Sequence, residues 1–216
     1  MIRKPVVAGS FYPDNSDELE QMIQNCFTHR FGPNSNPPKQ SIERVFGVIC
    51  PHAGYMYSGP IASHSYYEIS SQEFDLAIII GPNHLAIGSK IATMSDAKWQ
   101  TPLGISEVDS ESSNELLTIA DNIEQDYFSH SKDHSLEVQI PFLQEIFPNN
   151  LKILPIIMAK QDIDAAKEVG NAISQIAKSK KTMIIGSSDF THYEENDFAH
   201  KQDMSLIEPI LKMDVK

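Results

Sequence analysis

Short runs of apolar residues recur along this chain, and longer amphipathic segments separate them. The clearest run is LAIII at residues 76–80, and TMIIG at 182–186 is another. An uninterrupted apolar run of this length is typical of a strand buried on both faces of a sheet. Because such strands alternate with helical segments at a spacing of about 30 residues, we expect an α/β fold. Its central sheet should be mostly parallel or mixed, with helices on both faces.

The residue pattern of each segment predicts its structure. Strands are expected at 45–50, 76–80, 151–158 and 182–186, with a weaker one at 89–94. Helices are expected at 17–29, 58–69, 110–122, 135–147, 163–178 and 203–213. Pro155 has no N–H group to donate within a sheet, so we expect the strand at 151–158 to lie at an edge or to be irregular.

The composition limits the class of protein. At 216 residues the chain has the size of one domain, and we expect residues 1–216 to form a single α/β domain. The net charge of -12 argues against nucleic acid or an anionic membrane as the main partner, because no excess of Lys and Arg is present. No apolar run approaches the ~18–20 residues of a membrane-spanning helix. Two cysteines give no disulfide framework, so a reducing cytoplasm is the expected compartment.

Three of the predicted strands end in the same way. VFGVIC runs into PHAGY, LAIII runs into GPNH, and TMIIG runs into SSDFTHY. Each apolar run therefore gives way to Pro, Gly or Ser and then to His52, to His84, or to Asp189 and His192. In open α/β sheets ligands bind beyond the carboxyl ends of the strands, so we expect these polar side chains to converge on one crevice.

The residue types at this crevice suggest a metal site. Two neutral imidazoles, His52 and His84, and the carboxylate of Asp189 are the parts of a 2-His-1-carboxylate site, which suits non-haem Fe(II). Imidazole also suits Zn, Cu and Ni, so these residues do not define the metal. An alternative for Asp189 is that it caps the turn after its strand.

The segment DHSLEVQIPFL at 133–143 allows two interpretations. In both, Asp133 is the N-cap of a helix. In the first, the segment is an ordinary amphipathic helix; in the second, the helix also presents His134 to the cleft at its N-terminus, where the helix dipole lowers the imidazole pKa. His130 is expected in a surface loop. Trp99 lies in WQTPLG, which we expect to be a loop, and is either a packed anchor or a wall of a pocket.

Six motifs in this order closely resemble those of the Memo family: RKPVVAGSFYP, PHAGYMYSG, GPNH, WQTPLG, DHSLEVQIPFL and GSSDFTHY. The resemblance covers residues 3 to about 193. Family members are labelled AmmeMemoRadiSam system protein B in archaea and bacteria, and mediators of cell motility in eukaryotes. The family is similar in fold to class III extradiol ring-cleaving dioxygenases, so the resemblance implies that fold here.

The resemblance also implies roles for individual residues. His52 and His84 would be the two imidazole ligands of the metal, and Asp189 would line the same cleft. His192 and His134 would lie there too, and either would act as general acid or base, since a neutral imidazole near pH 7 both takes and gives a proton. The expected substrate pocket includes Tyr55, Asn83 and Trp99.

The third ligand of the family is a cysteine in a Cys-Gly segment, on a strand after the last helix. This chain ends in LKMDVK without that segment, so we expect a C-terminally shortened form in which the final strand is missing. Cys50 lies two residues before His52 on the same face of its strand, which makes it a candidate substitute ligand. The alternative is a packed strand cysteine.

The residues and the resemblance to the Memo family together imply three candidate functions. The first is a metal-dependent oxidoreductase of the extradiol-dioxygenase-like class, with iron or copper and a small oxygen-bearing substrate. The second is a non-catalytic adaptor, whose vestigial cleft takes a phosphotyrosine-type ligand on backbone N–H groups in the turns after Cys50 and Ile80. The third is an accessory component that acts on a partner protein, together with a radical SAM protein and a small companion. The sequence does not predict the oligomeric state.

Overall fold

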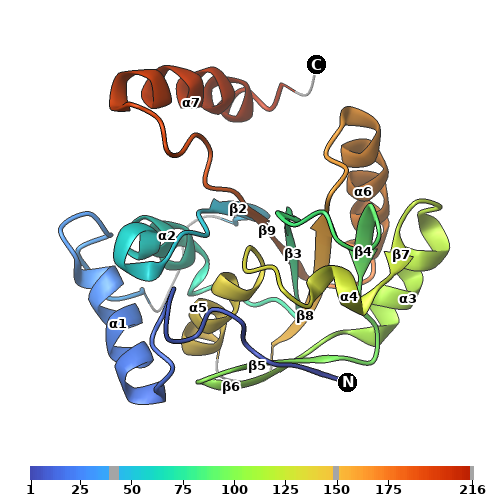
Figure 1. The fold of residues 1–216 in the computed structure, drawn as a ribbon, viewed down its shortest axis with the longest axis horizontal. Coiled ribbons are helices and arrows are strands. Elements are labelled where there is room, and N and C mark those ends of the chain that lie inside the picture. The colour runs from blue at the N-terminus through green and yellow to red at the C-terminus, as the bar shows by residue number, and fades with distance from the viewer. Residues whose placement is uncertain (39–43, 148–150, 215–216) are drawn as a thin grey trace.

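The computed structural model describes residues 1–38, 44–147 and 151–214. At its centre is a six-stranded sheet in the order β2-β9-β3-β8-β4-β7 (Figure 1). The strands are β2 (Gly47–Cys50), β9 (Thr182–Ser187), β3 (Leu76–Pro82), β8 (Lys152–Met158), β4 (Ile91–Thr93) and β7 (Glu124–Gln125). Only β4 and β8 pair antiparallel among these neighbours, so the sheet is mixed, as expected.

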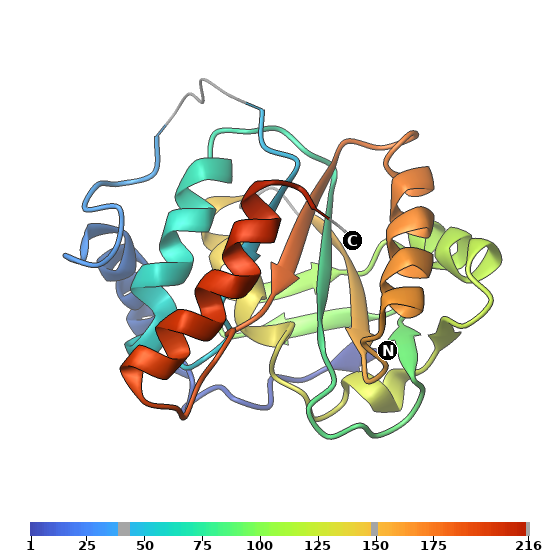
Figure 2. The same cartoon turned by 90° about the horizontal axis from the view of Figure 1, so that it is seen from above.

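Helices cover both faces of this sheet, which confirms the predicted α/β class (Figure 2). Side chains of β3 alternate between the faces: Ala77 and Ile79 belong to one apolar cluster, and Leu76 and Ile78 to the other. The first cluster is covered by α1 (Ser16–Thr28), α2 (Tyr55–Ile69) and α5 (Ile140–Ile146). The second is covered by α3 (Ser110–Ile119) and α6 (Ile163–Ile176).

A second, three-stranded sheet was not predicted. It has the order β1-β5-β6 and lies beside the first apolar cluster, with β1 (Ile2–Arg3), β5 (Lys98–Thr101) and β6 (Gly104–Glu107) (Figure 1). The expected loop around Trp99 is therefore wrong, because this residue lies in β5 and pairs with Arg3 of β1. Strands this short have no readable periodicity, and the pairing joins segments that lie far apart in the sequence.

Of the two expectations for Pro155, the edge strand is wrong, because β8 lies between β3 and β4, whereas pairing is irregular at this residue. The Thr93 hydroxyl donates to the Pro155 carbonyl over 2.8 Å, so the main-chain polar groups of Pro155 face β4. On that side, the last residue of β8 that pairs with β4 is Ile156. The next bridge along β8 joins its Ile153 to Val108. Pro155 occupies the gap between these partners, where a missing N–H costs no ladder hydrogen bond.

Helix boundaries also differ from the predictions. The single helix expected at 135–147 is divided into a 3-10 turn, Glu137–Gln139, and α5, with Pro141 in the first turn of α5. The last helix, α7 (Asn196–Leu211), begins earlier than expected and has no buried residue. His130 belongs to α4 (Tyr127–His130) and is fully buried, so its assignment to the surface is wrong. Among the described residues, no helix combines the length and apolar character needed to cross a membrane.

Candidate metal centre

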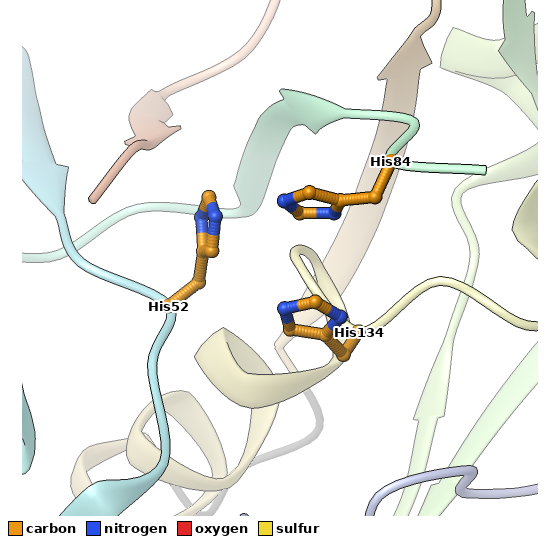
Figure 3. A group of neighbouring side chains, drawn as sticks. All are labelled: His52, His84 and His134. Atoms are coloured by element: carbon orange, nitrogen blue, oxygen red, sulfur yellow. The ribbon is translucent and has the colours of Figure 1, made fainter. Parts of the chain in front are cut away.

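Three imidazoles meet beyond the ends of the parallel strands. His52 follows β2, His84 follows β3, and His134 lies between α4 and the 3-10 turn; Figure 3 shows their rings converging from these three segments. One nitrogen of each ring lies within 4.8 Å of a nitrogen of the other two. Imidazole nitrogens are metal ligands, so a group of three at this separation is a candidate site for one ion.

The strand order explains why two of these residues meet. β9 lies between β2 and β3 and runs parallel to both, with Cys50 of β2 opposite Ser187 of β9. His52 and His84 therefore leave the sheet at the same edge, on either side of the end of β9. Their ring centroids are 5.1 Å apart, and the His84 ring stacks on His134 with centroids at 4.6 Å.

The hydrogen bonds of Ser187 determine which His52 nitrogen is free. The single hydroxyl proton of Ser187 is donated to the Ser135 carbonyl over 2.7 Å, and the oxygen accepts from the Gln139 amide. The His52 Nδ1, 2.9 Å from the same oxygen, must then be the donor of that contact. The neutral ring consequently carries its proton on Nδ1, and its Nε2 keeps a lone pair for a metal.

His84 is oriented by a carboxylate. Its Nδ1 lies 3.0 Å from Asp133 Oδ2, and its backbone N–H donates to the same oxygen over 2.7 Å. The other oxygen, Oδ1, accepts the N–H of Ser135. Asp133 is thus not the N-cap of a long helix but a support for His84, which leaves the His84 Nε2 facing the other rings. Carboxylate–imidazole pairs of this kind are the usual outer partners of metal-binding histidines.

Burial keeps two of the rings uncharged near pH 7. It lowers the pKa of His52 to about 4, although the nearby Asp189 carboxylate opposes the shift. Burial also lowers the pKa of His134, with a further contribution from His84. The helix dipole proposed for His134 is not the cause, because α5 begins only at Ile140. The hydrogen bond to Asp133 has the opposite effect and raises the pKa of His84.

Asp189 lies beside this cluster and caps the turn that carries His52. Its Oδ1 accepts the backbone N–H groups of His52 and Ala53, the latter over 3.1 Å. Its Oδ2 lies 3.9 Å from the His52 Nε2. Asp189 therefore caps the turn after β2 and not, as the sequence alternative had it, the turn after its own strand β9. Its other carboxylate oxygen lies near the metal-binding nitrogens.

Two other predicted residues lie outside the cluster of ring nitrogens. His192 is exposed, and its Nδ1 lies 2.9 Å from the Phe190 carbonyl. Cys50 is fully buried in the apolar core, and burial raises the pKa of its thiol to about 12, opposed by Ser65. These surroundings match a packed strand cysteine and give no metal-binding thiolate.

The three residues expected to line a substrate pocket are mostly engaged in the core. The Tyr55 hydroxyl donates to the Val138 carbonyl over 2.6 Å, within the first apolar cluster. Trp99 is buried beneath the Arg3 guanidinium, 4.0 Å from its ring centroid, so it is a packed anchor. Asn83 is buried next to His84 and donates to the Ile87 carbonyl, which holds the turn after β3.

The proposed cradle for an anion is already filled. The backbone N–H groups of His52 and Ala53 donate to Asp189, and that of His84 donates to Asp133. Because carboxylates of the chain itself occupy these donors, the turns after β2 and β3 do not offer them to a phosphate group. These three N–H groups therefore do not form the expected anion cradle.

Sequence reasoning missed the supporting roles of Ser187 and Gln139. Gln139 donates to Ser187 and to the Pro51 carbonyl, and accepts from the Tyr66 hydroxyl. One signal was present: Glu137 and Gln139 are polar residues within an otherwise apolar stretch, LEVQIPFL, and both are buried. Buried polar side chains of this kind must have partners, so they indicate a hydrogen-bonded network.

The chain is therefore an α/β protein with a mixed central sheet, and the three imidazoles beyond the strand ends form a candidate metal-binding site. The chain matches the family model described as Memo-like protein over residues 3–216. It therefore belongs to the Memo family, and the resemblance inferred from its six motifs is confirmed.

Individual relatives agree with this assignment. A MEMO1 family protein of Nitrosopumilus maritimus is 60% identical over 216 residues, which cover 100% of this chain and 78% of the relative. A relative from Methanocaldococcus jannaschii is 45% identical over 224 residues, with the same two coverages of 100% and 78%. A relative from Sulfolobus acidocaldarius is 43% identical over 225 residues, again covering 100% and 78%.

Proposed function

We propose that this protein is a metal-dependent oxidoreductase of the extradiol-dioxygenase-like class. Iron or copper would be held by His52, His84 and His134. The observation that carries the proposal is the convergence of three imidazole nitrogens within 4.8 Å, two of them on rings whose Nδ1 is engaged elsewhere. An all-imidazole set suits iron, copper, zinc and nickel, and the redox-active members of this group fit the proposed chemistry.

The bound metal would supply redox chemistry with O₂ at a small oxygen-bearing substrate. The chain's own residues define the approach to that substrate. The His52 side chain is 3% exposed, whereas that of His84 is 36% exposed, so the centre opens to solvent on the His84 side. Asp189 has one oxygen without a backbone donor near His52, and this oxygen is suited to accept a proton from substrate.

This assignment gives His134 the part of third ligand, which the sequence reading gave to Asp189. The carboxylate would instead hold the His52 turn, through the two backbone N–H groups that it accepts. His192 is not needed at the centre in this scheme. We also propose a reducing, cytoplasmic compartment, to which the two free, buried cysteines are suited.

The experiment that tests the proposal is an anaerobic titration with Fe(II) and Cu(I). Wild type should bind one ion, and His52→Ala, His84→Ala and His134→Ala should each lose stoichiometric binding. His64→Ala is the matched control, because His64 is an exposed histidine of α2 outside the cluster. Oxygen uptake by the loaded wild type, absent in His84→Ala, would then support catalysis. Wild type that binds neither ion would contradict the proposal.

A further inference from the structure

One short segment supports all three candidate ligands. We call residues 130–139 the site segment. It contributes His134 directly, its Asp133 orients His84, and its Gln139 donates to Ser187, the hydroxyl partner of His52. The position of this segment therefore decides whether the three rings share one ion.

The N-terminus holds the site segment through a buried arginine. Arg3 is 1% exposed and donates along three directions. Its Nε donates to the His130 carbonyl over 2.7 Å, and its Nη2 to the Asp133 carbonyl over 2.6 Å. Its Nη1 forms an ion pair with Glu137 at 2.6 Å. A planar guanidinium makes these contacts with fixed mutual geometry, so it fixes three points of the site segment at once.

Glu137 completes the attachment from the other side. Fully buried, it accepts the backbone N–H groups of Val6 and Val7 and the hydroxyl of Tyr12, the last over 2.7 Å. Its carboxylate is therefore satisfied by donors from the N-terminal segment alone. The neighbouring Phe11 places its ring 4.7 Å from that of His134.

We propose that Arg3 and Glu137 are positioning residues of the metal centre, which hold His134 and Asp133 where the three imidazoles share one ion. The inference rests on the proposed function. A buried ion pair adds little to stability relative to apolar residues of the same volume, because desolvation offsets its attraction. Its contacts with the carbonyls of His130 and Asp133 instead give it a geometric role at the site.

The test compares Arg3→Lys with Val169→Ala. Lysine keeps the charge and loses the planar set of donors, whereas Val169 is a buried residue of α6 on the opposite face of the sheet. Co(II) affinity is measured by competition with a chelating dye. We expect a loss of about 10–100-fold in Arg3→Lys, as for other outer partners of metal ligands, and none in Val169→Ala. Equal affinities in the two variants would overturn the proposal.

A second readout needs no metal. Asp133 accepts the amide N–H groups of His84 and Ser135, so their hydrogen exchange reports whether Asp133 stays in place. In metal-free Arg3→Lys both amides should exchange faster, while Asn83, bonded to the Met158 carbonyl, should not. Unchanged exchange at His84 and Ser135 would overturn the positioning role. Wild type that binds no Co(II) would refute the metal site, and the exchange rates would then decide the positioning role alone.

If Arg3→Lys does not fold, Tyr12→Phe provides the same test in a milder form. It removes one hydroxyl donor from Glu137 and keeps the ring within the core. We expect a smaller loss of Co(II) affinity and faster exchange of the Ser135 amide. Wild-type values for both would overturn the proposal.

Discussion

At the scale of single residues, the chemistry of the centre depends on which ring nitrogen carries the proton. The Ser187 hydroxyl has one proton and donates it to the Ser135 carbonyl, so it can only accept from His52. A serine at a strand end thus selects the tautomer of a candidate ligand. Ser187 stands within the motif GSSDFTHY, but the motif does not reveal this role, because the role depends on what the hydroxyl proton bonds to.

Ser187→Ala should therefore weaken metal binding without removing a ligand. The His52 ring would lose the acceptor of its Nδ1 proton and with it the preference for a free Nε2. We expect Co(II) affinity to fall by about 10–100-fold, measured by chelator competition. Ser188→Ala is the control, because the Ser188 hydroxyl accepts from the backbone amide of Phe190. Equal affinities in the two variants would show that the tautomer argument is wrong.

At the scale of elements, two glycines illustrate opposite constraints. Gly170 lies inside α6, and a Cβ built there meets no atom within 4 Å. Gly88 has a φ of +75° in the loop after β3, and a Cβ there would lie 2.2 Å from the Asp126 carboxylate. The helix therefore tolerates a side chain that the loop excludes.

Gly170→Ala should stabilise the protein by about 0.5–1 kcal/mol, because alanine loses less backbone entropy in a helix. Gly88→Ala should destabilise it by about 2 kcal/mol or more, through backbone strain and the displaced carboxylate. Urea unfolding of the two variants beside wild type measures both effects. A destabilised Gly170→Ala would mean that α6 packs more tightly than the structure shows.

At the scale of the whole molecule, buried histidines link stability to pH. Burial, with a contribution from the Arg3 charge, lowers the pKa of His130 to about 3. In the unfolded chain the pKa of this histidine is about 6.5, so below that pH the unfolded chain binds a proton that the folded protein does not bind. Stability should therefore fall as pH decreases from about 6.5 toward 3, by about 1.4 kcal/mol per pH unit for this residue.

Between pH 7 and pH 5, His130 should account for about 2 kcal/mol of lost unfolding free energy. His130→Gln lacks this titration, so its stability should change less over that interval, whatever its stability at pH 7. His64→Gln, at an exposed position of α2, should behave as wild type. Urea unfolding at the two pH values gives the comparison. Identical pH dependence in wild type and His130→Gln would exclude a buried, neutral His130.

Metal binding should also change the stability of the whole fold. An ion that binds only the folded protein adds about 2.7 kcal/mol at a free concentration of 100 times its Kd. We expect Co(II) to raise the urea midpoint of wild type and to leave that of His84→Ala unchanged. A shift of equal size in both proteins would indicate binding outside the imidazole cluster.

The sequence by itself indicated five of the six central strands, all but β7, and two of the three candidate ligands. Apolar runs such as that at 76–80 are typical of buried strands, and the turn residues after them place His52 and His84 within a few residues of a strand end. Both conclusions depend on local pattern, because the spacing of apolar side chains and the residue types of a turn are properties of residues that are neighbours in the sequence.

Only the tertiary structure decided which group joins them. His134 lies beside the two strand-end histidines in a segment whose Asp133 carbonyl accepts from Arg3, more than one hundred residues earlier in the chain. The tertiary structure also decided that His130 is buried. It decided the position of Pro155 inside the sheet as well, because that position depends on how far the neighbouring strand β4 extends. These features arise from contacts between distant segments, and no periodicity within one segment records where a distant partner will lie.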